Sequence, residues 1–167
     1  MTRADLTAVV AALAAAGPVG WSGLPAELRA APDDETFEVV LGSEREEADL
    51  LQLPDVADGC AARAWLRGGV VVLVEIRWRS GAPAWPPDSG GGPEARDDVV
   101  DGLVVVEAGE WIYPQRGLAV VMNQDATAAR RLFGFVPTTL DVYRRLLRPD
   151  LSTVRRPAVR MTGGDHL

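Results

Sequence analysis

A pair of glycines, Gly68-Gly69, lies between two strand-like segments and constrains the fold more than any other feature of the sequence. Glycine adopts positive φ angles without steric cost, so two adjacent glycines suit the tight turn of a two-residue β-hairpin. Residues 70–79 on one side are rich in β-branched side chains, and residues 61–67 form the other arm. The sequence therefore predicts an antiparallel hairpin over residues 61–79.

An even register, counted outward from this turn, defines the two faces of the hairpin. It places Trp65 opposite Val72 and Arg63 opposite Val74, so these four side chains share one face. Glu75 then belongs to the other face, because successive side chains of a strand point to opposite sides. Both faces are apolar near the turn. We therefore expect half of this ribbon to be covered on both sides.

Further strand-like segments follow in quick succession nearer the C-terminal end. They cover residues 103–107, 111–113, 118–122 and 128–136. The connections between them are short and contain turn residues, which is typical of an antiparallel meander. With the hairpin, they predict an α+β fold in which N-terminal helices and one C-terminal helix pack on an antiparallel sheet.

Three segments carry the helical signals. Apolar side chains recur at helical spacing over residues 6–13, and Gly17 ends this helix with the proline that follows it. A second helix is predicted over residues 33–41, because its three initial acidic residues favour the positive end of a helix dipole. A last helix is predicted after Thr138, with an apolar stripe over residues 140–147.

Two segments lack any strand or helix signal. Residues 80–98 contain four prolines and four glycines, which predicts a long loop that acts as a lid or an insertion. Residues 150–167 contain three arginines and no apolar periodicity, so we expect an extended or flexible tail. The sequence therefore predicts a single domain over residues 1–149, followed by this tail.

All 17 basic residues are arginine, and lysine is absent. Without an amine side chain there is no Schiff-base lysine, no amine general base and no P-loop lysine. This usage, beside abundant Ala, Gly, Val and Asp, is typical of a GC-rich bacterial genome. Cys60 is the single cysteine, which excludes an intrachain disulfide and favours a cytoplasmic protein. No apolar run approaches the roughly 20 residues of a membrane span, so no membrane is expected as a partner.

The net charge of −7 is unevenly distributed. Residues 33–58 hold ten acidic residues and one arginine, whereas residues 116–167 hold nine arginines and four acidic residues. Such asymmetry is compatible with a partner surface, with an acidic mimic of nucleic acid, or with two halves that neutralise each other. We expect no nucleic acid as a partner, because the arginine pairs are not interleaved with aromatic residues on a basic face.

No catalytic constellation is recognisable, and we expect neither a metal nor a cofactor. His166, the single histidine, lies in the expected tail, where no partner can orient it as a base. Cys60 lacks neighbours that would lower the pKa of its thiol, so we expect it to be buried and structural. The alternative is a carboxylate-dependent enzyme or small-molecule binder, in which two of Glu75, Glu107 and Glu110 face one cleft.

Aromatic and arginine side chains together form the centres of many protein interfaces, and this chain offers such a group. The candidate binding residues are Arg63, Trp65, Arg67, Trp85 and Arg116. We expect Trp65 and Trp85 to be partly exposed, with the loop around Trp85 as a flap. The sequence thus favours a non-catalytic module of the accessory, immunity or leader-peptide-binding type, which binds a protein or peptide through a strand edge and this patch. A homodimer formed through the sheet is a further alternative.

Overall fold

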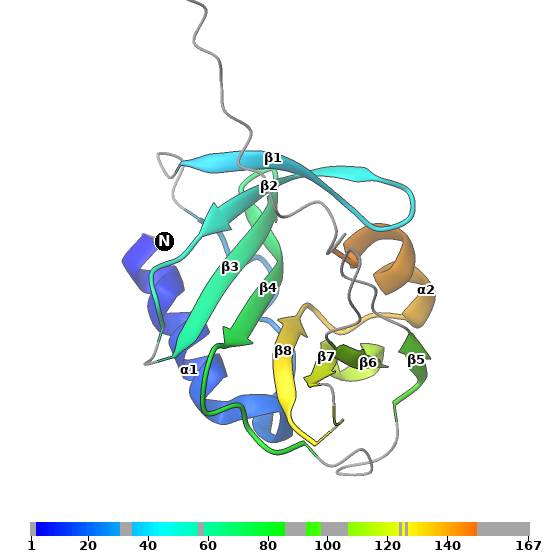
Figure 1. Ribbon diagram of the computed structural model, residues 1–167. Coiled ribbons are helices and arrows are strands. Elements are labelled where there is room, and N and C mark those ends of the chain that lie inside the picture. Colours follow the sequence, from blue (N-terminus) through cyan, green and yellow to red (C-terminus); the bar gives the residue numbers. More distant parts are fainter. Residues whose placement is uncertain are drawn as a thin grey trace, which may run out of the picture.

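The computed structural model describes residues 3–30, 35–56, 59–85, 93–97, 107–123, 125 and 127–149. Eight strands form one antiparallel sheet, and short helical segments accompany it together with one longer helix (Figure 1). The fold is mainly sheet with some helix, which agrees with the predicted α+β class.

The sheet consists of two meanders that meet in its middle. The strands are β1 (Thr36–Leu41), β2 (Glu46–Gln52), β3 (Cys60–Arg67), β4 (Val70–Trp78), β5 (Ala95–Asp97), β6 (Glu107–Tyr113), β7 (Leu118–Asn123) and β8 (Ala129–Gly134). Their order is β1-β2-β3-β4-β8-β7-β6-β5, so the second meander joins the first where β4 pairs with β8. The two edge strands are β1 and β5.

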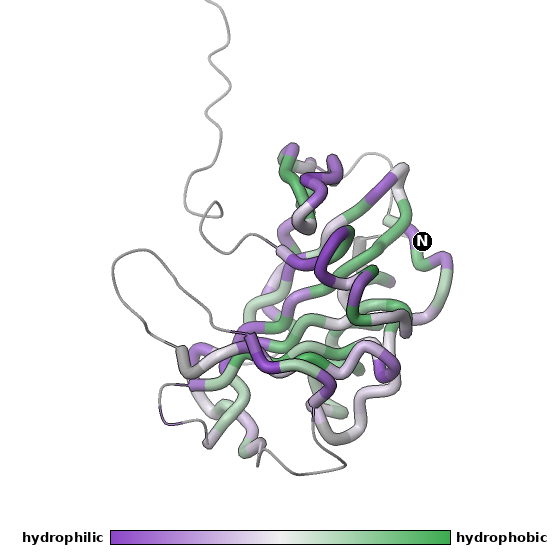
Figure 2. Tube along the Cα trace, turned by 90° about the vertical axis from the view of Figure 1, so that its right-hand side faces the viewer, coloured by the Kyte–Doolittle hydropathy of each residue, from purple (hydrophilic) through white to green (hydrophobic). Residues whose placement is uncertain are grey.

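The predicted Gly-Gly hairpin and the antiparallel C-terminal meander are both present, as β3–β4 and as β6–β7–β8. The strand expected over residues 111–113 is part of the longer β6, while residues 101–106 lie outside the described ranges. Figure 2 shows that hydrophobic residues are concentrated along the central strands, as expected for a sheet covered on both faces.

The first helix, α1 (Arg3–Gly20), packs on one face of the sheet (Figure 1). Leu6 is fully buried against this face, as its helical spacing predicts. Gly17 adopts a φ of 65°, which interrupts the helix at the predicted position. The indole N–H of Trp21 donates a hydrogen bond to Gly117 O at 3.0 Å, so the end of α1 is fixed to the turn before β7.

The opposite face packs against the C-terminal helical segment. Here α2 (Leu140–Val142) continues directly into a π-type turn, η2 (Tyr143–Leu147). The side chain of Thr139 caps α2 by accepting a hydrogen bond from the Val142 N–H. The fully buried side chains of this face, which we call the η2 face, include Leu41, Trp65, Leu73, Ile112, Phe133, Phe135 and Tyr143.

The η2 segment contacts the turn between β1 and β2. The N–H groups of Gly42 and Ser43 donate to the carbonyls of Arg148 and Arg144, at 2.7 and 3.0 Å. These bonds satisfy carbonyls at the end of a helical segment that have no partner within it. Gly42 has a φ of 71°, and a Cβ atom there would overlap the Arg145 carbonyl, so only glycine permits this approach.

A β-bulge between Trp65 and Leu66 shifts the register of the β3–β4 hairpin by one residue. Trp65 pairs with Leu73 and Arg63 pairs with Glu75, so the evenly counted pairing was wrong beyond the first residues after the turn. A shift of one residue moves every following side chain of β4 to the other face. Glu75 therefore lies on the η2 face beside Arg63, and not on the opposite face as expected.

Residues 36–41 form β1, which corrects the helix predicted over residues 33–41. Phe37 and Val39 alternate with exposed side chains, and all six residues pair with β2. Cross-strand packing overrides the weak helical preference that the acidic residues provide. Residues 31–34, where that helix was expected to begin, lie outside the described ranges.

The segment expected as a loop over residues 80–98 contains secondary structure. Its residues 95–97 form β5, and Ala84 forms an isolated bridge with Ala128. The prediction of a long loop is therefore wrong for these residues, because both ends of the segment pair with residues of the second meander. Residues 86–92 and 98, and the tail over residues 150–167, lie outside the described ranges.

Candidate functional site

Trp65 and Trp85 were expected to be partly exposed, and both are 1% exposed. Trp65 belongs to the apolar cluster of the η2 face, where its ring meets that of Phe133 edge-on. Trp85 belongs to the cluster under α1 and packs edge-on against Tyr113, with ring centroids 5.9 Å apart. For Trp85 the expectation of exposure was wrong because the bridge at Ala84 holds the start of the loop on the sheet. For Trp65 it was wrong because the apolar cluster of the η2 face covers its side chain.

The three candidate arginines each bind a group within the fold. Arg63 Nε donates to Glu75 Oε2 at 2.6 Å, and Arg67 donates to the Leu146 carbonyl at the end of η2, where a cation suits the helix dipole. Arg116 donates to backbone carbonyls that follow α1, and its guanidinium also lies over the Trp85 ring. The five candidates therefore divide between the two faces of the sheet and do not form one exposed surface.

Glu75 and Glu110 are both buried on the η2 face, yet they stand far apart. Glu75 lies in β4 and Glu110 in β6, with two strands between them. Three strand spacings amount to about 14 Å along the sheet. The acid pairs of glycosidases are separated by about 5–9.5 Å, so these two carboxylates do not form such a pair. Glu107 also lies in β6, and its side chain is outside the description.

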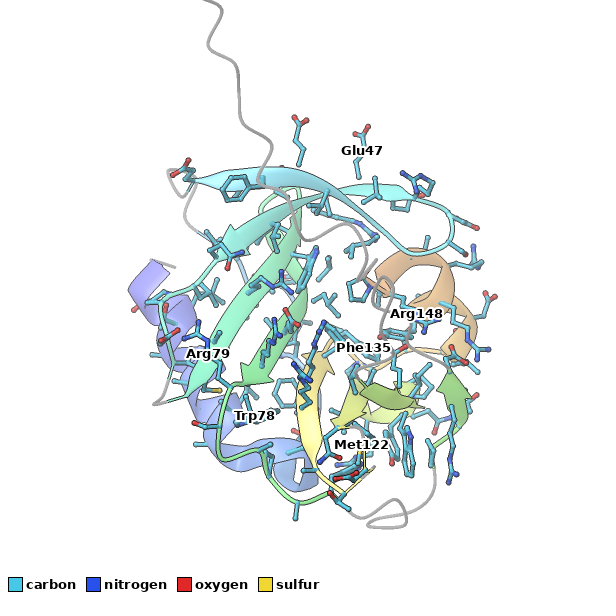
Figure 3. All side chains as sticks on the ribbon, viewed as in Figure 1. Glu47, Trp78, Arg79, Met122, Phe135 and Arg148 are labelled. Carbon is cyan, nitrogen blue, oxygen red and sulfur yellow. The ribbon has the colours of Figure 1, made fainter. Side chains whose placement is uncertain are left out.

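Glu110 belongs to a buried network that joins β5 and β6 to the η2 segment. The Tyr143 hydroxyl donates to Glu110 Oε1, and Arg148 Nε lies 2.8 Å from Glu110 Oε2. Asp97 stands directly opposite Glu110, and Arg148 Nη1 lies 3.2 Å from its carboxylate. Arg144 donates two further hydrogen bonds to Asp97, at 2.6 and 3.1 Å. Two adjacent carboxylates are thereby matched by two arginines, and Figure 3 shows Arg148 beside these strands.

The network changes the acidity of its buried members. Desolvation raises the pKa of Glu110 above its ordinary value, and the attraction of Arg148 and the Tyr143 hydrogen bond oppose this only in part. Desolvation, and then the charge of Glu110, raise the pKa of Tyr143 well above its usual range. Perturbed acids mark candidate catalytic sites, but structural ion networks perturb them equally. Since every group here binds another element of the fold, the network's evident role is to attach η2 to the sheet.

Stability should depend on pH through Glu110. Because its pKa is raised in the folded state, its contribution is complete below the ordinary value of 4.5 and is lost as the pH rises through the raised pKa. Glutamine carries no charge at any pH. We therefore expect Glu110→Gln to remove the loss of stability that Glu110 causes as the pH rises. Urea unfolding of both proteins between about pH 4 and 8 measures the difference. The exposed Glu46→Gln serves as a control, and a decline of equal size in Glu110→Gln would contradict the assignment.

Cys60 is buried as expected, and desolvation raises the pKa of its thiol, which disfavours the nucleophilic thiolate. Over the ranges that the structure describes, no three His, Cys, Asp or Glu side chains are grouped so that they could hold a metal ion. No helix among the same residues is both long and apolar enough to cross a membrane.

The outer edge of β1 is the remaining candidate for a binding site. β1 pairs with β2 on one side, and on the other side Leu41 forms an isolated antiparallel bridge with Pro149. Because Pro149 has no N–H, the hydrogen bonds of this bridge are made by the residues on either side of Leu41 and Pro149. One of these bonds joins the Gly42 N–H to the Arg148 carbonyl at 2.7 Å. Backbone groups alternate along a strand. Every second residue of β1, counted from Gly42, therefore directs its N–H and C=O groups to the free edge.

These edge-facing groups belong to Thr36, Glu38 and Val40. Val40 adjoins the bridge at Leu41, and within the described part of the chain no backbone or side-chain group forms a hydrogen bond on this side with Thr36 or Glu38. Thr36 and Glu38 are exposed, and Val40 is half-buried. Such a row of unpaired donors and acceptors is a template on which another extended segment can pair.

A cluster of carboxylates lies beside this edge. Glu38 stands directly opposite Asp49, and Glu47 lies on the same face, two residues before Asp49. Directly opposed like charges destabilise a strand pair. The opposed carboxylates of β5 and β6 share an arginine, whereas no arginine in the described ranges forms an ion pair with these three. Figure 3 shows the Glu47 side chain directed away from the rest of the molecule. The cluster is therefore accessible to a cationic partner.

Sequence reasoning identified the acidic segment and a strand edge but did not connect them. The missed signal was the recurrence of Phe37, Val39 and Leu41 at every second residue, with the exposed Thr36 and Glu38 on either side of Phe37, followed by a glycine-containing turn. Comparison of the chain with protein-family models, curated proteins and solved structures found no match. The functional argument therefore depends on the chemistry of the site.

Proposed function

We propose that this chain is a non-catalytic binding module that takes up an extended peptide or protein segment on the free edge of β1. The observation that supports the proposal is the row of edge-facing backbone groups at Thr36 and Glu38, which have no hydrogen-bond partner on this side among the described residues. A strand added there would exchange main-chain hydrogen bonds with these residues, which provide affinity for many sequences. Selectivity then depends on the side chains that flank the row.

The other edge of the sheet is less suited to this role. β5 contains three residues, and its Asp97 already binds Arg144 and Arg148. Short edge strands are a common protection against pairing with another chain. β1 is twice as long, since it contains six residues. The proposal therefore assigns the ligand to β1.

The charge beside the edge predicts which ligands are preferred. A residue opposite Glu38 lies next to the carboxylate of Glu38, with that of Asp49 one strand further along the sheet, so a basic side chain is favoured there. An opposite-charge pair across two strands contributes about 0.2–1 kcal/mol. On the other face, Phe37 and Val39 are half-buried, and apolar ligand residues would cover them further. The preferred ligand thus alternates apolar residues with a central arginine or lysine.

Heptapeptides that differ at the central residue test this preference. We expect peptides with a central arginine to bind the full chain more tightly than those with glutamate, and to shift the amide resonances of β1. In the variant Glu38→Gln/Asp49→Asn the arginine peptide should lose about 1 kcal/mol, or fivefold in affinity. Asp125→Asn, which removes a single negative charge from the turn between β7 and β8, should leave binding unchanged.

The same measurements can reject the proposal. If no peptide shifts the resonances of β1, or if binding shifts other strands instead, the edge is not the site. If the two neutral substitutions reduce binding no more than the Asp125→Asn control, the acidic pair has no part in selectivity. Raised salt should weaken the preference for arginine more than the main-chain contribution.

A further inference from the structure

The free part of the β1 edge is short and is closed at one end. Thr36 and Glu38 have no hydrogen-bond partner on this side among the described residues. At the end of the strand, Pro149 already occupies the position opposite Leu41. A segment that adds to this edge therefore cannot continue past Leu41 within the sheet, so it either ends near Glu38 or leaves the sheet there.

The direction of the added segment decides which of its ends lies at the closed end of the edge. In an antiparallel segment the amino-terminal side points toward Leu41, whereas in a parallel segment the carboxyl-terminal side does. A ligand that ends near Glu38 therefore carries there either an α-ammonium group or an α-carboxylate group. Because these two groups have opposite charges, the charges around Glu38 favour one direction over the other.

Carboxylates dominate the surroundings of the closed end. Glu38 is exposed on the edge, and Asp49 and Glu47 follow on the same face in β2. No arginine in the described ranges forms an ion pair with these three. Arg45, the one basic residue of β1, β2 and their turn, lies beyond Leu41. An α-ammonium group is therefore attracted to this end, while an α-carboxylate group is repelled.

We propose that the β1 edge takes up the free amino terminus of an extended chain, whose first residue stands opposite Glu38. This inference rests on the proposed function of the same edge. The α-ammonium group donates to the Glu38 carbonyl and lies beside the Glu38 carboxylate, so the ligand needs no basic side chain. The second residue covers the half-buried Phe37, and the third pairs with Thr36. Both edge residues without a described partner are then paired.

A chain without a free end at this position fits the edge less well. In a heptapeptide whose central residue stands opposite Glu38, the first residue falls opposite Leu41, where Pro149 stands. Its amino-terminal residues therefore have to leave the sheet, and the α-ammonium group moves away from Glu38. An internal segment of a protein meets the same obstacle. The site thus distinguishes an amino terminus from an internal strand both by charge and by the closed end of the edge.

Acetylation of a peptide's amino terminus tests the role of charge. The probe is the peptide amide Thr-Val-Thr-Ser, whose α-ammonium group is its only charge. We expect it to shift the amide resonances of Thr36 and Glu38 in the full chain, and its acetylated form to bind about fivefold more weakly. In Glu38→Gln the two forms should bind alike, whereas Asp125→Asn, which also removes one charge, should retain the difference. Equal binding of both forms by the wild-type chain, or a difference that persists in Glu38→Gln, overturns the inference.

Extension of the same peptide tests the closed end of the edge. Three glycines added before its first residue carry the α-ammonium group to the position opposite Leu41, where Pro149 stands. This peptide should bind at least about fivefold more weakly, because it loses the charge pair with Glu38. Three glycines added after its last residue extend away from Leu41 and should leave the affinity nearly unchanged. Equal affinities of the two extended peptides contradict the assigned direction.

The outcomes separate this inference from the proposed function. If peptides with a basic side chain bind β1 while the free and acetylated forms of the probe bind equally, the inference alone fails. If no peptide of either kind shifts the resonances of β1, the proposed function fails and the inference fails with it. If the free amine is preferred but the shifts lie on other strands, the recognition belongs to another site, which also overturns the inference.

Discussion

Replacing Trp65 by alanine should lower the free energy of unfolding by about 3–5 kcal/mol, the usual cost of removing a buried aromatic side chain. Trp65 is 1% exposed and packs against Phe133 with ring centroids 6.4 Å apart. The guanidinium of Arg63 lies 5.4 Å from the Trp65 ring centroid, so the substitution also removes a cation–π contact. Urea unfolding followed by circular dichroism measures the change.

The expected loss distinguishes a core residue from an interface residue. Val136→Ala is the matched control, because Val136 is 39% exposed and its truncation should cost less than about 1 kcal/mol. An exposed tryptophan in a binding patch would behave like this control. A loss as small as that of Val136→Ala would therefore restore Trp65 to the candidate surface.

Glu75→Gln should lower the free energy of unfolding by about 3–5 kcal/mol, because it removes one partner of a buried ion pair. The Glu75 side chain is 2% exposed and that of Arg63 is 14% exposed. Glu75 Oε1 also lies 3.8 Å from Arg131 Nη1, so one carboxylate balances charge from two arginines. The amide keeps the shape of the side chain but leaves the desolvated guanidinium of Arg63 without its counter-charge.

The exposed pair of Arg79 and Asp55 provides the control for Glu75→Gln. Their side chains are 61% and 58% exposed, and the closest atoms are 3.3 Å apart. Exposed ion pairs contribute about 0–1 kcal/mol, so Asp55→Asn should change stability little. Chemical unfolding of the two variants at one pH and salt concentration compares them. Similar losses in both would show that burial adds nothing to the Arg63–Glu75 pair.

Local signals predicted the elements that depend on neighbouring residues. The Gly68-Gly69 turn lies between strands that pair with each other, and the meander strands are joined by short turns. The pairing of β4 with β8 could not be predicted, because it joins segments about fifty residues apart and follows from packing rather than from turn chemistry. The order of the strands in the sheet depends on this one contact.

The bulge in the hairpin explains why the candidate site was misread. Turn type and alternation predict an even register, whereas the bulge adds one residue, Val72, between the partners of Leu66 and Trp65, and neighbouring residues do not reveal it. Its consequence is that Glu75 meets Arg63 on the η2 face. Arg63 could therefore be predicted as a conspicuous residue, while its burial in an ion pair could not.

At β1 the local pattern was visible in the sequence but was interpreted wrongly. Residues 36–41 were assigned to a helix because acidic residues precede them, although Phe37, Val39 and Leu41 alternate as a strand requires. Short apolar patterns are ambiguous until a partner strand is known, and β2 supplies it. The acidic composition of this region was visible in the sequence, whereas its position beside an unpaired edge was not.

The junction of β4 with β8 also bears on synthesis of the chain. The first residue of β8 leaves the ribosome 51 residues after the last residue of β4. At about 5–20 residues per second this interval lasts about 3–10 s. Throughout it the apolar β4, from Val70 to Trp78, has no partner on its second side. Nascent chains of this protein therefore pass through a period in which they can pair with one another, and crowded polysomes would favour aggregation during that period.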